Sequence, residues 1–422
     1  MIVGMAKSRY VLILIALLVL LGISLLACPV LIRALPGRYA YYLPEPLQEL
    51  RHNHHPDTLP TPITINTPAP VFVHTSTPTH TPTPTPQPPT STPSPTPTPT
   101  PPARFTLTGL RHEHQGWNNC GPTTLAMALS YWGRDETQYD TAPALKPDPE
   151  DKNVSPWEME AYVRGLGLGA IVRACGDLER LKMLVRLGFP VVVETWYVRD
   201  ARDQLGHYRL IIGYDDVARQ FITYDSLHGP DVTIGYQELD ELWRVFNRIY
   251  LVVYAPEQWD ALATILGSDV DDATMYERAL ETARAEAESP PASCVAYADC
   301  ADWVTFSWFS AGSSLTSLGR HAEAAAAYDR ARQLGLHYRM LWYQFGPYES
   351  YYSVGRYDDV IALADATLAT TSNLEESYYW RGKARLSQGD AGGARADFDT
   401  ALRYHENWSP AVIALAEMES AD

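Results

Sequence analysis

The sequence is poor in cysteine and in basic residues, and each shortage narrows what the protein can be. Five cysteines in 422 residues are too few for a dense disulfide framework, so the folded parts must be held together by burial of apolar side chains. Lys and Arg total 33 against 50 Asp and Glu, which gives a net charge of −17. This charge argues against nucleic acid as a partner, because phosphate binding requires a basic surface.

The sequence also lacks the Gly-x-x-x-x-Gly-Lys-Ser/Thr string of phosphate-binding loops and a set of His, Cys and carboxylate residues with convincing metal-ligand spacing. His112 and His114 form a single His-x-His, which we interpret as loop residues. We therefore expect neither a metal nor an organic cofactor. The length of the chain indicates two or three domains.

A long apolar run near the N-terminus predicts a membrane anchor. It extends from Tyr10 to Ile32 and follows two basic residues. About 20 apolar residues span a bilayer as a helix, and basic residues before the run keep the N-terminus in the cytoplasm. We therefore expect residues 1–33 to cross the cell membrane once, with the bulk of the chain outside the cytoplasm. Lipidation of Cys28 is the less favoured alternative, because the apolar run continues beyond it.

Composition divides the remainder into three segments. Residues 34–104 are rich in Thr, Pro and Ser and predict an extended linker, because proline removes backbone donors and fixes φ. Residues 105–255 alternate strand-like and helical patterns, which predicts an α+β domain. Residues 256–422 are rich in alanine and predict an all-α domain. The interpretation of the linker as a spacer without further role is preferred.

Cys120 lies in the segment QGWNNCGPTTLAMALSYWG, which predicts a helix beginning at that cysteine. Pro122 suits the first turn of a helix, and Gly133 suits its end. The partial positive charge at a helix N-terminus favours thiolate over thiol. Gln115, in the loop before the helix, can donate its amide to a developing oxyanion. Taken alone, this segment does not rule out that Cys120 is a buried structural cysteine.

A second segment, GHYRLIIGYDDVARQFITYDS, predicts a hairpin that begins with His207 and ends with Asp225. With the turn centred near Asp216, His207 and Asp225 are expected to face each other directly and on one side of the sheet. A neutral imidazole can take a thiol proton, and a carboxylate can fix its tautomer. Asp215 and Asp216 lie at the turn, too far along the strand to reach His207.

These two segments together resemble the C39-like peptidases, a branch of the papain-like cysteine peptidases. The resemblance covers about residues 105–255 and implies a papain-like α+β fold. It implies Cys120 as nucleophile, His207 as base, Asp225 as orienting acid and Gln115 as oxyanion donor. The best-known relatives are joined to export ATPases, a role that the missing nucleotide-binding string argues against.

The C-terminal segment carries an internal repeat. Gly319, Gly355 and Gly389 recur at intervals of 36 and 34 residues, each followed by small and aromatic positions at similar spacing. The pattern resembles tetratricopeptide repeats and predicts antiparallel helix pairs from about residue 305 to 420, with the glycines outside the helices. The middle repeat departs from the pattern at Tyr348. Such domains usually bind proteins or peptides, which makes a protein partner the expectation here.

The sequence therefore predicts a membrane-anchored extracytoplasmic cysteine peptidase acting on a peptide or protein. Two alternatives remain open: an acyl or amide transferase on the same triad, and a catalytically idle scaffold with working repeats. Cys175 is interpreted as a small apolar residue near a strand end. Cys294 and Cys300 are either disulfide-bonded or two free thiols, and the sequence favours neither.

Overall fold

The computed structural model covers the whole chain and describes residues 32, 39, 56–63, 101–200, 203–296, 300 and 302–421. Almost all of the predicted anchor and most of the predicted linker lie outside these residues, so both stay predictions. Within the described part of the chain, none of the helices combines the length and apolar character that crossing a bilayer requires.

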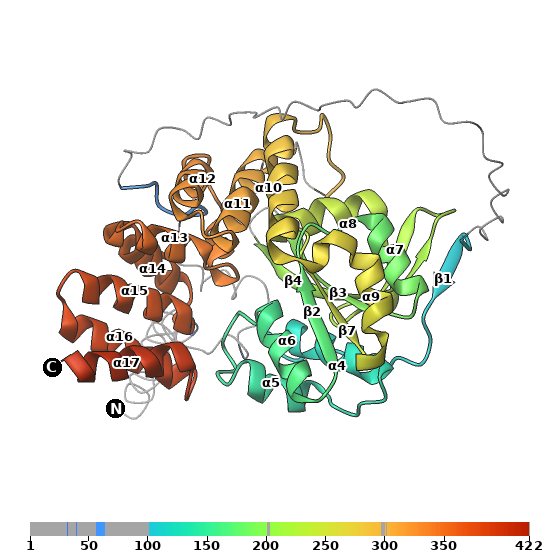
Figure 1. Cartoon of the computed structure of the whole chain (residues 1–422), viewed down its shortest axis with the longest axis horizontal. Coiled ribbons are helices and arrows are strands. Elements are labelled where there is room, and N and C mark those ends of the chain that lie inside the picture. The colour runs from blue at the N-terminus through green and yellow to red at the C-terminus, as the bar shows by residue number, and fades with distance from the viewer. Residues whose placement is uncertain are drawn as a thin grey trace, which may run out of the picture.

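The N-terminal part of the described chain, residues 101–255 (the sheet part), is built on one antiparallel sheet. Its strand order is β2-β7-β3-β4-β5-β6, and β1 pairs with β4 beside this path. Residues 191–196 of the central strand β3 are buried without alternation, which indicates that helices cover both faces of the sheet (Figure 1). The strands are β1 (Arg104–Thr106), β2 (Gly169–Arg173), β3 (Val191–Asp200), β4 (Asp203–Asp215), β5 (Gln220–Asp225), β6 (Gly229–Gly235) and β7 (Tyr250–Tyr254).

The helices of the sheet part begin where the sequence supplies capping groups. Ser155 and Thr137 each accept from a backbone N–H in the first turn that follows, and each has an acidic side chain three residues on that reaches back to its own N–H. The helices are α4 (Cys120–Tyr131), α5 (Gln138–Leu145), α6 (Pro156–Gly165), α7 (Leu178–Arg186) and α8 (Tyr236–Trp243), and α8 continues into the short 3₁₀ helix η1 (Arg244–Phe246).

The C-terminal part is entirely helical, and no strand occurs within residues 302–421. After α9 (Trp259–Leu266), the helical part, residues 272–421, contains α10 (Asp272–Glu288), α11 (Trp303–Ser317), α12 (His321–Gln333), the 3₁₀ helix η5 (Tyr338–Trp342), α13 (Gly346–Ser353), α14 (Tyr357–Thr370), α15 (Glu375–Ser387), α16 (Ala391–Tyr404) and α17 (Ser409–Ala421). Gly319, Gly355 and Gly389 have φ values of +70°, +77° and +87° and lie in the turns between α11 and α12, α13 and α14, and α15 and α16. The predicted helix pairs and their glycine turns are confirmed.

The departure of the middle repeat has a packing explanation. In the outer two pairs a glycine of the first helix meets a ring of the second: a Cβ on Gly312 would lie 2.6 Å from Tyr328, and one on Gly382 would lie 2.7 Å from Phe398. In the middle pair the bulk is on the other helix, because Tyr348 of α13 is fully buried and donates to Thr367 of α14. The helices still pack because large and small residues have exchanged sides.

Residues 56–63, inside the predicted linker, lie on the helical part. The Leu59 N–H donates to the Leu336 carbonyl, and Leu59 itself is buried. Arg332, also buried, donates to the carbonyls of Pro60 and Thr61. This short stretch is therefore a docked strap and not a free spacer, which corrects the interpretation of the linker at this point.

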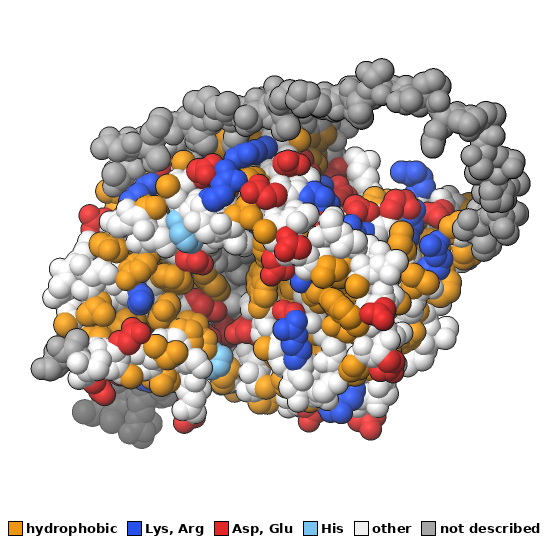
Figure 2. Space-filling view, viewed as in Figure 1, with side chains coloured by type: hydrophobic (Ala, Val, Ile, Leu, Met, Phe, Trp, Pro, Cys, Tyr) orange, Lys and Arg blue, Asp and Glu red, His pale blue; other side chains and the backbone are white. Residues whose placement is uncertain are grey.

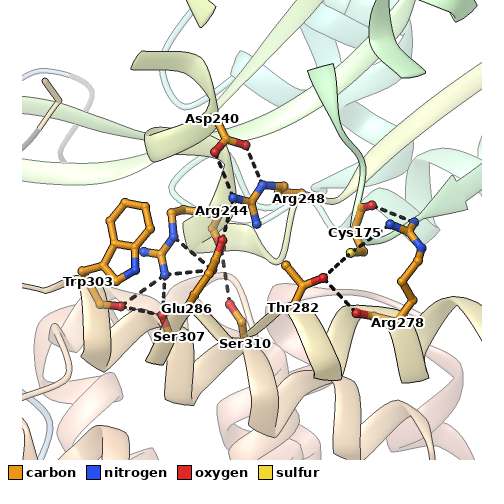
Figure 3. Close-up of polar contacts among 10 residues, drawn as sticks. All are labelled: Cys175, Asp240, Arg244, Arg248, Arg278, Thr282, Glu286, Trp303, Ser307 and Ser310. Carbon is orange, nitrogen blue, oxygen red and sulfur yellow. Dashed lines mark hydrogen bonds and ion pairs between the residues drawn. The ribbon is translucent and has the colours of Figure 1, made fainter. Parts of the chain in front are cut away.

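A buried charge network joins the two parts (Figure 3). Arg244 of η1, only 1% exposed in its side chain, donates to Glu286 of α10 and to Ser307 of α11, and its guanidinium lies 3.6 Å from the centre of the Trp303 ring. Arg248 donates to the same Glu286. Glu286 is thus the shared anion of two arginines, and it fixes α10 against the sheet part.

We expect Glu286→Ala to lower the free energy of unfolding by about 3 kcal/mol, because the change leaves the buried Arg244 guanidinium without its carboxylate, while Arg248 keeps Asp240. Glu281→Ala, at an exposed position of the same helix, should cost less than about 0.5 kcal/mol. Urea unfolding followed by circular dichroism measures both values, and equal effects would contradict the role given to Glu286.

Candidate active site

Cys120 is the first residue of α4, as the sequence predicted. The helix is buried from Gly121 to Leu129, and its start is pressed against neighbouring elements. A Cβ on Gly121 would lie 3.0 Å from Met159 of α6 and 3.2 Å from Val154, so a larger residue would press on these two side chains. Glycine directly after Cys120 therefore lets the start of α4 pack closely against α6 and the segment before it.

The Cys120 thiol is held in a mixed electrostatic environment. Burial raises its pKa most, and the neighbouring Glu194 adds to this effect. The backbone N–H groups of Tyr208 and Gly121 and the Lys146 ammonium act in the opposite direction. The net result is a raised pKa, so the helix start alone does not make a resting thiolate, and a base is required to take the proton.

His207 supplies a neutral imidazole with one nitrogen committed. Its Nε2 lies 3.0 Å from Asp225 Oδ1, and the ring is buried. Burial lowers the pKa of His207 more than Asp225 raises it, so the ring is uncharged at neutral pH. Because an ionised carboxylate only accepts, Nε2 carries the proton and Nδ1 keeps its lone pair. His207 directly precedes Tyr208, whose N–H faces the Cys120 sulfur.

Asp225 is fully buried and surrounded by donors. Burial by itself would raise its pKa, but the hydrogen bond from His207 and the charge of Arg209 hold the pKa well below its usual range. Arg209 Nε lies 3.1 Å from Oδ2, and the N–H groups of Leu227 and His228 donate to Oδ1 at 2.9 and 3.1 Å. The carboxylate therefore stays ionised and cannot rotate away from the imidazole.

The register of the hairpin differs from the one predicted. Leu210 pairs with Tyr224, and the same register, extended by one residue, places Arg209 opposite Asp225. A bulge lies between Ile211 and Gly213. His207 and Asp225 are therefore diagonal neighbours and do not face each other directly. The prediction of direct opposition was wrong by two residues, and the even shift leaves both side chains on the same face of the sheet.

The rival carboxylates have other partners at the turn. Asp215 pairs with Arg104 and accepts from the N–H groups of Val217 and Ala218. Asp216 accepts from Lys182 and Tyr236. Neither has a contact with His207, in agreement with their predicted distance along the strand.

Gln115 lies in a loop fastened to the end of β5. Its N–H donates to the Ser226 carbonyl at 2.9 Å, and its side-chain oxygen accepts from the Ser226 hydroxyl at 2.8 Å. His112 Nε2 lies 3.0 Å from the Asp225 carbonyl oxygen. With its oxygen engaged, the Gln115 amide presents its NH₂ group as a donor. The loop before Cys120 and the strand end that holds Asp225 are thus one connected structure.

Three further residues, which were not singled out from the sequence, shape the site. Gln138, buried at the start of α5, accepts from Gly116 N–H at 2.6 Å and from Asn119 at 3.0 Å, and so fixes the loop before Cys120. Arg209 pairs with Asp225. In the sequence it could have been found as the single cationic residue of the predicted strand HYRLIIGY, two residues after His207. Glu194 is buried beside Tyr208, and burial raises its pKa to about 8.

Acidic side chains of both parts meet near this site. Asn153 of the sheet part donates to Glu376 of α15 at 3.2 Å. Burial, and then the neighbouring carboxylates, raise the pKa values of Asp151 and Glu376 well above the usual range. Figure 2 shows a hollow between the two parts with acidic side chains along it.

The other cysteines lie apart from this arrangement. Cys175 is buried after β2, and its sulfur contacts Arg278 at 3.2 Å and Thr282 at 3.4 Å, both on α10 (Figure 3). Cys294 and Cys300 form a disulfide, which settles the pairing that the sequence left open. Among the described residues, no group of three or more His, Cys, Asp or Glu side chains could hold a metal ion.

Residues 108–253 match the model of the Peptidase_C39 like family. A solved structure of a Bacillus anthracis protein described as a C39-like peptidase matches with 16% sequence identity over 36% of this chain and 96% of its own, at a TM-score of 0.30. No curated protein matches the chain significantly. Residues 108–253 are thus similar to C39-like peptidase domains, and an all-helical region follows them.

Asp225→Asn should lower the free energy of unfolding by about 3 kcal/mol, because Arg209 then stays buried without an anion. Asp216→Asn, in the same hairpin but 40% exposed in its side chain, should cost less than about 1 kcal/mol. Urea unfolding at pH 7 compares them. A loss for Asp216→Asn that equals the loss for Asp225→Asn would refute the assignment.

The same pair predicts a pH dependence. The pKa of Asp225 is depressed in the folded protein, so its stabilising contribution is complete above the unfolded value of about 3.9 and is lost as the pH falls further. The gap in melting temperature between wild type and Asp225→Asn should therefore be constant between pH 7 and pH 6 and should narrow below about pH 4. Calorimetry across this range is the measurement, and a gap that widens in acid would be inconsistent with an ionised Asp225.

Proposed function

We propose that the chain is an extracytoplasmic cysteine peptidase that cleaves a peptide or protein through Cys120, His207, Asp225 and Gln115. The observation that carries the proposal is the hydrogen bond of 3.0 Å between His207 and Asp225. This bond leaves Nδ1 of His207 as the proton acceptor. The next residue in the chain is Tyr208, whose N–H faces the Cys120 sulfur. The match of residues 108–253 to a peptidase family supports the same chemistry.

In the proposed reaction, His207 Nδ1 takes the thiol proton of Cys120 as the sulfur attacks the substrate carbonyl. The oxygen becomes negative and receives the N–H of Cys120 and the amide of Gln115. The imidazolium then returns the proton to the departing amine, which leaves a thioester on the sulfur. Water, deprotonated by the same imidazole, releases the acid and restores the thiol.

Asp225 has two tasks in this scheme. It keeps the proton on Nε2, so that Nδ1 is always the nitrogen available to the thiol. It also lowers the free energy of the imidazolium that forms when the thiol is deprotonated. Because the resting thiol has a raised pKa, transfer to His207 during attack is more favourable than a preformed thiolate.

The proposed location is the outer side of the cell membrane, with the N-terminal segment as anchor. The disulfide between Cys294 and Cys300 supports an oxidising compartment, since such bonds are rare in the cytosol. We also propose that the helical part is of tetratricopeptide type and engages a protein. Its glycine turns and exchanged large and small residues support this.

Iodoacetamide should alkylate Cys120 in preference to Cys175, because the Cys175 side chain is buried against α10. Labelled peptides are quantified by mass spectrometry in wild type and in Cys120→Ala, at pH 7 and without denaturant. Labelling of Cys175 at the same rate as Cys120 would overturn the assignment of the nucleophile.

Hydrolysis of fluorescently labelled casein should fall at least 100-fold in His207→Ala, because the base is lost. His228→Ala is the matched control, since this side chain is exposed and only its backbone N–H holds Asp225. The control should keep its rate within about threefold of wild type. Casein hydrolysis that survives both His207→Ala and Cys120→Ala would exclude the proposed mechanism.

A further inference from the structure

One edge of β4 is left without a strand partner beside the candidate nucleophile. Strand β5 pairs with β4 only as far as Leu210, while β3 continues along the opposite edge. Alternate residues of a strand direct their N–H groups to the same edge, about 6.8 Å apart. The N–H groups of Gly206 and Tyr208 therefore share this bare edge, one on each side of His207.

Each of these two N–H groups faces a side chain from another element. The Tyr208 N–H faces the Cys120 sulfur, and the Tyr208 carbonyl accepts from Thr124 of α4 at 3.4 Å. The Gly206 N–H faces the hydroxyl of Tyr343, which comes from the helical part. Tyr343 and Cys120 are thus neighbours along one strand edge.

The approach of Tyr343 depends on glycine. A Cβ on Gly206 would lie 3.1 Å from the Tyr343 ring and 3.1 Å from Phe246, which is tighter than side chains normally tolerate. The two rings also contact each other, with their centres 5.9 Å apart. Glycine directly before His207 is therefore needed for the helical part to reach this edge.

The segment that carries Tyr343 is anchored on both sides. Arg339 of η5 donates to the Asp203 carboxylate at 2.7 Å and to the Gln204 carbonyl at 2.8 Å, at the start of β4. Gln344 donates to the Val245 carbonyl at 3.4 Å. This segment lies just before α13, the short helix of the middle repeat, where the pattern departs from its neighbours.

We propose that Tyr343, contributed by the helical part, is a positioning residue of the peptidase reaction. Its hydroxyl accepts the Gly206 N–H and so fixes the backbone directly before His207. An extended peptide bound beside Cys120 would then lie against the ring of Tyr343. This inference rests on the proposed function, and it makes the helical part a wall of the substrate site.

The test uses a peptidyl vinyl sulfone, which captures an activated thiol, on the full-length protein. Saturation kinetics separate KI, which reports binding, from kinact, which reports the chemical step. Tyr343→Phe removes only the hydroxyl, and kinact should fall about tenfold with KI within about twofold, as loss of one hydrogen bond implies. Tyr338→Phe is the control, because its hydroxyl accepts only from Arg339 in the same 3₁₀ helix.

Tyr338→Phe should match wild type in both constants, and a melting temperature near the wild-type value should accompany the Tyr343→Phe loss. Equal kinact in wild type and Tyr343→Phe would overturn this proposal while leaving the peptidase assignment intact. If kinact fell equally in Tyr343→Phe and Tyr338→Phe, the role of Tyr343 would be structural, and this outcome would also overturn the proposal. Wild-type protein whose Cys120 does not react would overturn both proposals together.

Discussion

The buried carboxylate of Asp225 is the group on which the site depends. It is fully buried, and it accepts hydrogen bonds from four donors: His207, Arg209 and two backbone N–H groups of the turn that follows. An isolated charge in such a place would be neutralised by protonation, and here the pKa moves the opposite way. One ionised group therefore fixes the tautomer of the imidazole and the path of the chain after β5.

Hydrogen bonds also connect the loop before Cys120 to the end of β5, next to Asp225. Gln115 is bound by Ser226, which directly follows Asp225, and Gln138 fixes the segment between Gln115 and Cys120. A shift of the hairpin would therefore move the amide donor together with the imidazole. The groups of the candidate site are thus kept in register by hydrogen bonds and by packing around Gly121.

The sequence predicted the elements of this arrangement better than their connections. Cys120 at a helix start, the hairpin and the glycine turns follow from local rules of capping, alternation and repeat spacing. The exact register did not, because the bulge after Ile211 depends on tertiary packing that local alternation cannot reveal. Arg209 and Glu286 were also not singled out, because a charge becomes structural only once a distant element covers it.

The middle helix pair shows how a break in a pattern can carry information. Its first helix, α13, is shorter than α11 and α15, the first helices of the neighbouring pairs. The 3₁₀ helix η5 precedes α13, and Tyr348 and Thr367 restore the packing that the missing glycine would have provided. The compensation keeps the helical part stable while its chain is diverted to Gly206. A repeat that served only to cap the sheet part would have no need of that diversion, and this supports the role proposed for Tyr343.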